Sequence, residues 1–231
     1  MEDKPRFQEL YDGFEGDELS PIWKTTKFEA GRVKFQSEFV REGKGAVEVN
    51  IQKYDKKDTN NSERDELLLD KRLGSFEDEE FSYEFSMYIP EDFPIVPTRL
   101  VIAQWKQEEG NVDAKINNPV LAIRYSSGKL HITAKTDEKK RHLWMTEEEV
   151  RGKWLDFKFY IKFSRKEGGY VKAWLNEEEI VNYVGLTAYD EEAGYPKNSR
   201  FYFKMGLYRD RMDEPMKIYI DEFKKRFIGE R

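Results

Sequence analysis

Hydrophobic and polar residues alternate with a period of two along much of this 231-residue chain. The clearest example is FYFKMGLYRD at 201–210, where one side of an extended segment would carry two Phe, a Met and a Leu, and the other two Tyr, a Lys and a Gly. Such alternation is typical of a strand that is buried on one face only. The same pattern recurs in further stretches: 81–89, 99–107, 119–125, 129–136, 154–164, 169–176 and 216–223.

Short turn-forming sequences separate several of these stretches. SSGK at 126–129 and KEGG at 166–169 each predict a hairpin. The best helical candidate is TEEEVRGK at 146–153, where Thr146 could cap the helix and the following glutamates suit its first turn. With no long amphipathic helix, repeat or linker, residues 1–231 are interpreted as one domain. We predict an all-β fold, an antiparallel β-sandwich of the jelly-roll kind with a concave face.

Composition narrows the class of protein. Aromatic residues make up 15% of the chain and hydrophobic residues only 38%, so large rings must supply much of the core. The chain has no cysteine, which excludes disulfides and a thiol nucleophile. A net charge of −6 argues against general nucleic-acid binding, and no apolar stretch is long enough to span a membrane. We expect a monomer that is secreted or periplasmic if an export signal has been removed, and otherwise cytoplasmic.

Strand alternation also groups polar side chains that could act together. Residues two apart lie on one face of a strand. This gives three sets: Arg64 with Glu66, Gln104 with Lys106, and Tyr202 with Lys204 and Tyr208. If the three sets line the same concave sheet, a ligand there would meet guanidinium, ammonium, amide and phenol groups. Such a surface would suit an anionic polysaccharide that carries carboxylates.

Three stretches carry a resemblance to a known family. RDEL at 64–67, QWK at 104–106 and YFKMGLY at 202–208 resemble the R-x-E-L, Q-x-H and Y-F-K-x-G-x-Y strands of jelly-roll polysaccharide lyases. The intervening sequence is similar to the heparin lyase I and glucuronan lyase group of the concanavalin A-like sandwich superfamily, and the motifs are also similar to those of alginate lyases. The resemblance covers most of residues 10 to 224.

The resemblance implies β-elimination at a uronic acid, a reaction that removes the proton at carbon 5 and expels the glycosidic oxygen from carbon 4. By position, Arg64 and Gln104 would hold and neutralise the substrate carboxylate. Tyr208 would deliver a proton to the leaving oxygen, and removal of the first proton is a second role open to it. Lys204 and Glu66 would orient the substrate or neighbouring side chains. Further substrate-binding candidates are Tyr202, His131 and Arg124.

The chain departs from that family in one motif, where Lys106 stands in place of histidine. Histidine titrates near neutrality, whereas lysine normally titrates near ~10.4 and becomes a base only when it is desolvated or crowded by other cations. Arg64 and Lys204 could provide that crowding. The chain has two histidines. His131 alternates with apolar neighbours and could face the groove, while His142 lies in a charged segment interpreted as a solvated loop.

Other interpretations of the same residues stay open. An Arg–Glu pair on a strand is more often a surface ion pair, and Trp105, Trp154 and Trp174 are interpreted as core. Without catalysis the chain would be a carbohydrate-binding sandwich, and a weaker alternative is a glycoside hydrolase with two carboxylates. The chemistry requires no cofactor, although DGFEGDE at 12–18 and YIDEF at 219–223 could hold a structural calcium ion.

Overall fold

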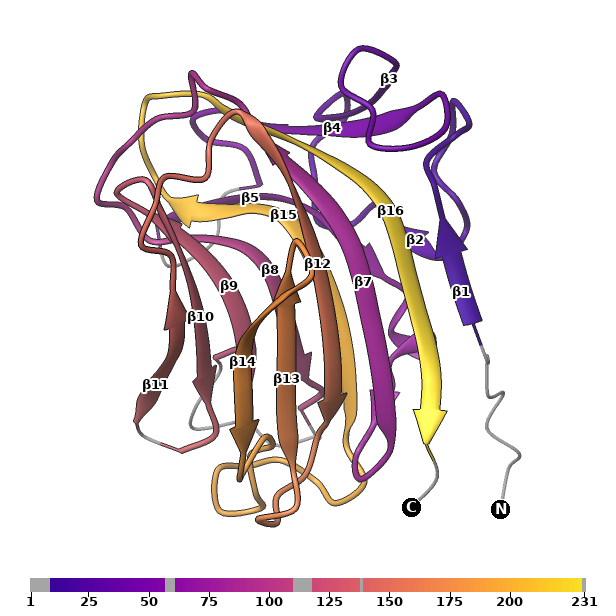
Figure 1. The fold of residues 1–231 in the computed structure, drawn as a ribbon, viewed down its shortest axis with the longest axis vertical. Coiled ribbons are helices and arrows are strands. Elements are labelled where there is room, and N and C mark those ends of the chain that lie inside the picture. The colour runs from indigo at the N-terminus through magenta and orange to yellow at the C-terminus, as the bar shows by residue number, and fades with distance from the viewer. Residues whose placement is uncertain (1–8, 57–60, 110–117, 138, 230–231) are drawn as a thin grey trace.

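The computed structural model describes residues 9–56, 61–109, 118–137 and 139–229, and it shows two antiparallel sheets packed face to face (Figure 1). The sheet nearer the viewer in Figure 1, here called the front sheet, has the order β14 (Glu178–Val184), β13 (Tyr170–Leu175), β12 (Lys153–Lys162), β7 (Glu80–Ile89), β16 (Met216–Gly229), β4 (Ala46–Ile51) and β3 (Val33–Gln36), with β1 (Glu9–Asp12) beside β16. The predicted all-β sandwich is confirmed.

The second sheet, here called the back sheet, lies behind the first in Figure 1. Its strands have the order β11 (Lys140–Met145), β10 (Lys129–Lys135), β9 (Leu121–Ser126), β8 (Leu100–Gln107), β15 (Arg200–Asp210), β5 (Ser62–Leu69) and β2 (Trp23–Lys24), with β6 (Ser75–Phe76) beside β15. One short 3₁₀ turn, η1 (Lys71–Leu73), supplies all the helix found in the described part of the chain.

The core lies between the two sheets and is built from alternate residues of each strand. The inward residues of β15 are the predicted apolar set, all fully buried: Phe201, Phe203, Met205 and Leu207. Trp105 of β8 is also fully buried, and its ring centroid lies 4.9 Å from that of Phe203 and 4.8 Å from that of Phe159 on β12. Because Phe159 belongs to the front sheet, these aromatic contacts join the two sheets.

Both predicted hairpins are present. In the first, Ser126 of β9 pairs with Lys129 of β10, and the two residues between them, Ser127 and Gly128, have φ values of 52° and 84°. Two positive φ values in a two-residue loop match the right-handed twist of the strands that the loop joins. In the second, β12 and β13 pair in antiparallel register on either side of 166–169.

The helix predicted at 146–153 is wrong, because tertiary contacts use the residues that would have formed it. The Thr146 hydroxyl, the expected cap, instead accepts the backbone N–H of Leu130 at 3.1 Å. Val150 is buried in the core, and Gly152 has a φ of 76° at the turn into β12. A weak local helical preference is readily overridden by such contacts.

The prediction that three tryptophans lie in the core is right only for Trp105. Trp154 and Trp174 are half-buried on the outer face of the front sheet, since they alternate along β12 and β13 with the buried residues. Their ring centroids lie 5.7 Å from that of Tyr88 and 5.3 Å from that of Tyr160, respectively. Strand alternation alone does not tell a wide aromatic side chain on the outer face from one in the core.

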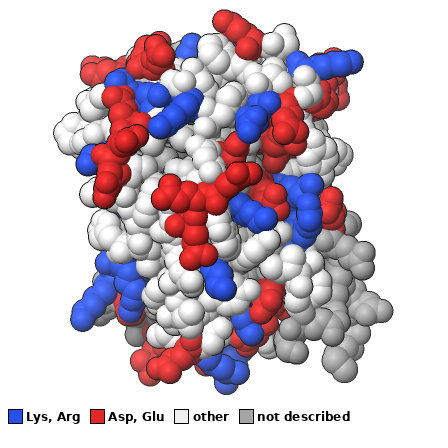
Figure 2. All heavy atoms as spheres, in the orientation of Figure 1, with Lys and Arg blue, Asp and Glu red and all other residues white. Residues whose placement is uncertain are grey.

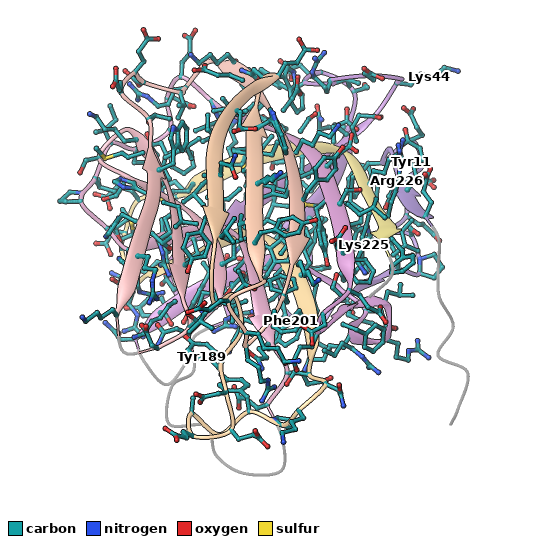
Figure 3. The ribbon with its side chains drawn as sticks, turned by 60° about the horizontal axis from the view of Figure 1, so that its bottom comes forward. Tyr11, Lys44, Tyr189, Phe201, Lys225 and Arg226 are labelled. Atoms are coloured by element: carbon teal, nitrogen blue, oxygen red, sulfur yellow. The ribbon has the colours of Figure 1, made fainter. Side chains whose placement is uncertain are left out.

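The outer face of the front sheet carries charges of both signs, with acidic and basic side chains interspersed (Figure 2). One example is the ion pair between Arg41 and Asp156, with an N–O distance of 2.8 Å. Figure 3 shows Tyr11 and Arg226 near each other at the edge where β1 joins β16, and Arg226 pairs with Glu9 of β1 at 2.8 Å. Among the described residues, no helix is both long enough and apolar enough to cross a membrane.

Candidate active site on the back sheet

A groove of about 650 Å³ lies on the outer face of the back sheet. The strand residues that line it alternate with the buried residues of β5, β8 and β15. The six basic residues of its walls are Lys27, Lys56, Arg64, Lys71, Lys106 and Lys204, and the two acidic ones are Glu108 and Glu109. The groove is therefore locally cationic in a chain whose net charge is −6.

The structure brings the three predicted polar sets together at this groove. Arg64 comes from β5, and Gln104 and Lys106 come from β8. β15 lies between these two strands and supplies the residues of its outer face, here called its outward row: Tyr202, Lys204, Gly206 and Tyr208. Three register pairs place the side chains next to each other: Gln104 with Lys204, Lys106 with Tyr202, and Arg64 with Tyr208. All six of these residues line the groove.

Glu66 lies beneath the groove, where it contacts three of the lining side chains. Its side chain is 2% exposed and does not line the groove. Gln104 donates a hydrogen bond from Nε2 to Glu66 Oε1, Lys204 Nζ lies 3.5 Å from Glu66 Oε2, and Arg64 lies 3.9 Å from the same oxygen. These contacts fit the second of the two roles expected for Glu66, the orientation of neighbouring side chains, which stays a prediction.

Two lysines in the groove, Lys106 of β8 and Lys204 of β15, have pKa values below that of a lysine in water. Burial lowers the pKa of Lys204 to about 8, and Glu66 opposes the shift. Burial also lowers the pKa of Lys106, with Glu109 opposing this shift and Arg64 adding to it. The cause is the same for both: taking an ammonium group out of water disfavours its charged form.

Tyr202 differs from these lysines because burial stabilises its neutral form. Burial, followed by the charge of Glu109, raises the pKa of Tyr202 above its ordinary value. The ammonium of Lys71, from η1, lies 4.5 Å from the centroid of its ring. Tyr202 therefore keeps its phenol proton to a higher pH than a tyrosine in water does, which makes it poorly suited to act as a base.

Gly206 leaves the middle of the outward row of β15 without a side chain, and the packing around it requires this. It has a φ of 138°, and a Cβ on it would lie 2.5 Å from the carbonyl oxygen of Asp65 and 2.8 Å from Cα of Glu66. The register of β15 against β8 shifts between Met205 and Tyr208 at the same place. A glycine here permits close approach of β5 and a local irregularity that re-aims the following residues, among them Tyr208.

The phenol of Tyr208 is surrounded by groups that donate hydrogen bonds or carry positive charge. Ser62 donates its hydroxyl hydrogen to the phenol oxygen at 3.3 Å, and Arg64 Cζ lies 4.2 Å from the ring centroid. Arg99 Cζ lies 4.5 Å from the same centroid. Neither Ser62 nor Arg99 was among the predicted site residues.

Two predicted substrate-binding residues, Arg124 and His131, lie on the same sheet but outside the groove lining. They form a register pair between β9 and β10, and Arg124 donates from Nε to the Thr133 hydroxyl at 3.0 Å. The His131 ring centroid lies 6.4 Å from that of His142, which is exposed on β11 and not in a loop as expected. Burial, with the charge of His142 adding to it, lowers the pKa of His131.

Basic residues from outside the strands complete the groove, and no sequence motif indicated them. Lys27 and Lys56 lie outside the strands, and Lys71 comes from the short η1 turn. Their positions depend on how connecting segments pack onto β5 and β15, which a period-two pattern does not describe.

In the two stretches suggested for calcium, two of the acidic side chains accept hydrogen bonds from the protein itself. Asp12 accepts hydrogen bonds from Trp23 Nε1 at 2.7 Å and from the Phe14 N–H at 2.9 Å. Asp221 accepts the backbone N–H groups of Arg41 at 2.9 Å and Glu42 at 3.3 Å. Across the ranges that the structure describes, no three His, Cys, Asp or Glu side chains are grouped to hold a metal. Structural calcium stays a prediction.

Comparison with known proteins identifies the family. Residues 11–224 match the family model described as polysaccharide lyase. The match spans most of the chain, and the protein therefore belongs to this polysaccharide lyase family. No curated protein matches the chain in sequence.

Solved lyase structures share the fold. An endo-β-1,4-glucuronan lyase from the fungus Trichoderma reesei superposes with a TM-score of 0.74 at 19% identity, covering 95% of each chain. A variant of the alginate lyase Aly36B, in complex with an alginate tetrasaccharide, gives 0.63 at 10% identity and covers 98% of this chain and 99% of that one. A variant of the family 7 alginate lyase A1-II′, in complex with substrate, gives 0.58 at 12% identity over 93% and 85%. At these identities the likeness shows a jelly-roll fold.

Proposed function

We propose that this protein cleaves a uronic-acid-containing polysaccharide by β-elimination in the groove of the back sheet. The observation that carries the proposal is the charge of the groove, whose walls hold six basic and two acidic side chains on an acidic protein. A groove of one sign of charge concentrates a ligand of the opposite sign. Membership of a polysaccharide lyase family supports the same class of reaction.

The reaction sets three tasks for the side chains. The proton on carbon 5 of a uronate is not acidic while the adjacent carboxylate is fully anionic, so donors must first neutralise that charge. A base then takes the carbon 5 proton, its electron pair forms a double bond to carbon 4, and the bond from carbon 4 to the glycosidic oxygen breaks. An acid gives a proton to the departing oxygen.

Arg64 and Gln104 are the donors proposed for the substrate carboxylate. The Arg64 guanidinium lines the groove as a fixed cation, and the Gln104 amide has a second N–H besides the one that Glu66 accepts. Lys204, whose pKa burial lowers to about 8, adds an ammonium group in the protonated form. Glu66 holds all three side chains in place from beneath.

Tyr208 and Lys106 are the groups proposed to move protons. A phenol can donate to a departing oxygen, and its phenolate form can take the carbon 5 proton. Lys106 is the other candidate base, because burial lowers its pKa and a neutral amine can accept a proton. Lys106 lies in the part of the groove next to Tyr202, and Tyr208 lies in the part next to Arg64.

A second candidate function is non-catalytic binding of the same class of polymer. The observation that favours it is the composition of the groove lining, which includes neither of the two histidines of the chain. If Lys106 cannot replace histidine as a base, the cationic groove would still bind an anionic polysaccharide. The two functions predict equal binding and differ in turnover.

The test is incubation of the protein with glucuronan, alginate, heparin and hyaluronan, followed by the ultraviolet absorbance of the unsaturated product. We expect absorbance to grow with at least one polymer. Tyr208→Phe keeps the ring and its packing but removes the hydroxyl, so its turnover should fall by roughly 10²-fold or more. Circular dichroism should show an unchanged fold.

Two results would contradict the proposal. New reducing ends without ultraviolet absorbance would indicate hydrolysis by carboxylates. Binding of a uronan without either product, in both the wild type and Tyr208→Phe, would indicate a carbohydrate-binding protein. An undiminished rate of elimination in folded Tyr208→Phe would leave the reaction class standing but remove Tyr208 from it.

A further inference from the structure

Two guanidinium groups flank Tyr208 from opposite sides of its strand. Arg64 belongs to β5, and its Cζ lies 4.2 Å from the ring centroid. Arg99 immediately precedes β8, and its Cζ lies 4.5 Å from the same centroid. Because β15 lies between β5 and β8, each neighbouring strand brings one cation to the ring. Arg64 lines the groove and Arg99 does not.

Arg99 is fixed to the strand that carries Tyr208. Its Nε donates to Asp210 Oδ1 at 2.8 Å, and its second guanidinium nitrogen lies 2.6 Å from the same oxygen. The backbone N–H of Asp210 also donates to the carbonyl oxygen of Arg99 at 3.1 Å. Asp210 is two residues beyond Tyr208 on β15, so the ion pair sets the position of the Arg99 charge relative to the phenol ring.

Ser62 and Arg124 are two further polar neighbours of Tyr208. Ser62, which is fully buried, donates its hydroxyl hydrogen to the phenol oxygen at 3.3 Å. Arg124 on β9 is close enough to interact electrostatically with Arg99 and with Tyr208. Burial and then the charge of Arg99 lower the pKa of Arg124, and Tyr208 opposes the shift. Positive charges and a donated hydroxyl hydrogen therefore surround the Tyr208 phenol.

We propose that Arg99 is a positioning residue for Tyr208, held by Asp210 so that its positive charge stabilises the phenolate through which Tyr208 passes during proton transfer. This inference rests on the proposed function. It holds for either role of the phenol, because Tyr208 must be a phenolate before it takes a proton and becomes one after it gives a proton. Arg64 is shared with substrate binding, whereas Arg99 has no other ionic partner than Asp210 among the described contacts.

The test is the titration of Tyr208 in the wild type and in Arg99→Met, measured without substrate by NMR of carbon-13-labelled tyrosine. The Tyr208 resonance is assigned by its loss in Tyr208→Phe. We expect the titration to move to higher pH by about one unit in Arg99→Met, with turnover lowered about tenfold and KM little changed. Arg99→Lys, which keeps the charge but not the planar fork, should recover part of both effects.

Arg226→Met is the matched control. Arg226 is also a partly exposed arginine, paired with Glu9 at 2.8 Å, but it lies at the β1–β16 edge (Figure 3). It should leave the Tyr208 titration and turnover unchanged. If Arg99→Met does not fold, Arg99→Gln keeps a hydrogen-bond donor for Asp210 but removes the positive charge, and a shift in the same direction is expected.

An unchanged Tyr208 titration in Arg99→Met would overturn the inference. So would a higher KM with unchanged turnover and titration, because Arg99 would then be a substrate-binding residue. The titration is read without substrate, so it tests Arg99 even if no uronan is cleaved. Conversely, a shifted titration in a protein that cleaves nothing would contradict the proposed function and leave only the electrostatic effect of Arg99 on Tyr208 standing.

Discussion

At the scale of single residues, Lys106 is where the candidate site departs from the lyases that the chain resembles. Its side chain is 14% exposed, and its Nζ lies 3.8 Å from Glu109 Oε1. Burial lowers its pKa, and the nearby Arg64 adds to that shift. A lysine in such surroundings releases its proton at a lower pH than a lysine in water does, which makes it a better base near neutrality.

Replacement of Lys106 tests whether this position moves a proton. Lys106→Ala should lower the rate of elimination about tenfold or more, because the candidate base is lost. Lys106→His should keep the wild-type rate near pH 7 or exceed it, since imidazole titrates close to that pH. The measurement is the initial rate of ultraviolet absorbance against pH. Lys158→His, on the outer face of the front sheet, is the control and should change nothing.

Equal rates in Lys106→Ala and the wild type would show that Lys106 takes no part in proton transfer. Tyr208 would then be left as the one group proposed for both protons. Loss of activity in both Lys106 variants would instead indicate that the ammonium charge itself is needed, for binding the polymer.

At the scale of secondary structure, β15 is the element that organises the site. Its inward row is core and its outward row lines the groove, so one strand fixes the site to the centre of the back sheet. Gly206 interrupts the outward row, where the backbone of β5 approaches closely. This close approach places Arg64 and Glu66 beside the side chains of β15.

Substitution of Gly206 should therefore cost both stability and activity. Gly206→Ala places a Cβ 2.5 Å from the Asp65 carbonyl oxygen in a backbone conformation with a φ of 138°. We expect the free energy of unfolding to fall by about 1–3 kcal/mol, measured by urea denaturation. Gly168→Ala is the control, because a Cβ there would have nothing within 4 Å, and its effect should be near zero. An equal effect of the two substitutions would contradict this account of Gly206.

Features within strands could be predicted from the sequence more readily than features outside them. Period-two patterns located eight strands shared between the two sheets, namely β7 to β10, β12, β13, β15 and β16, but they did not mark others such as β4, β11 and β14. The same alternation put Arg64, Gln104 and Tyr208 on outward faces, because strand geometry relates sequence parity directly to side-chain direction. The helix expected at 146–153 failed because Thr146 bonds to β10 instead of capping. Contacts made by residues outside the strands, such as the approach of Arg99 to Tyr208, depend on three-dimensional packing that no local pattern contains.

At the scale of the whole molecule, charge is distributed unevenly. The chain has a net charge of −6, and the outer face of the front sheet mixes acidic and basic groups (Figure 2). The groove on the opposite side of the sandwich has six basic and two acidic side chains. A polyanion would therefore be attracted to the groove and repelled by the protein as a whole, which favours binding in the groove over binding elsewhere.

This distribution predicts how polymer binding depends on salt and pH. In Tyr208→Phe, used so that the polymer is not cut, the affinity for a uronan should fall at least about tenfold from low salt to about 0.5 M, because salt screens the attraction. Affinity should also fall as the pH rises through 8, since burial lowers the pKa of Lys204 to about 8 and the lysine loses its positive charge above it. The shift of Lys106 is in the same direction. Isothermal titration calorimetry against salt and pH measures both effects.

A neutral β-glucan is the control ligand for this prediction. Binding of a neutral polymer does not involve charge attraction, so any affinity it has should change little with salt and should not follow the titration of Lys204. Tight, salt-independent binding of the glucan would indicate a neutral substrate and contradict the cationic groove as the basis of recognition. Salt-dependent uronan binding that stays constant through pH 8 would keep the polyanion as ligand but place Lys204 outside its contacts, leaving Arg64 and the loop lysines as the groups that bind it.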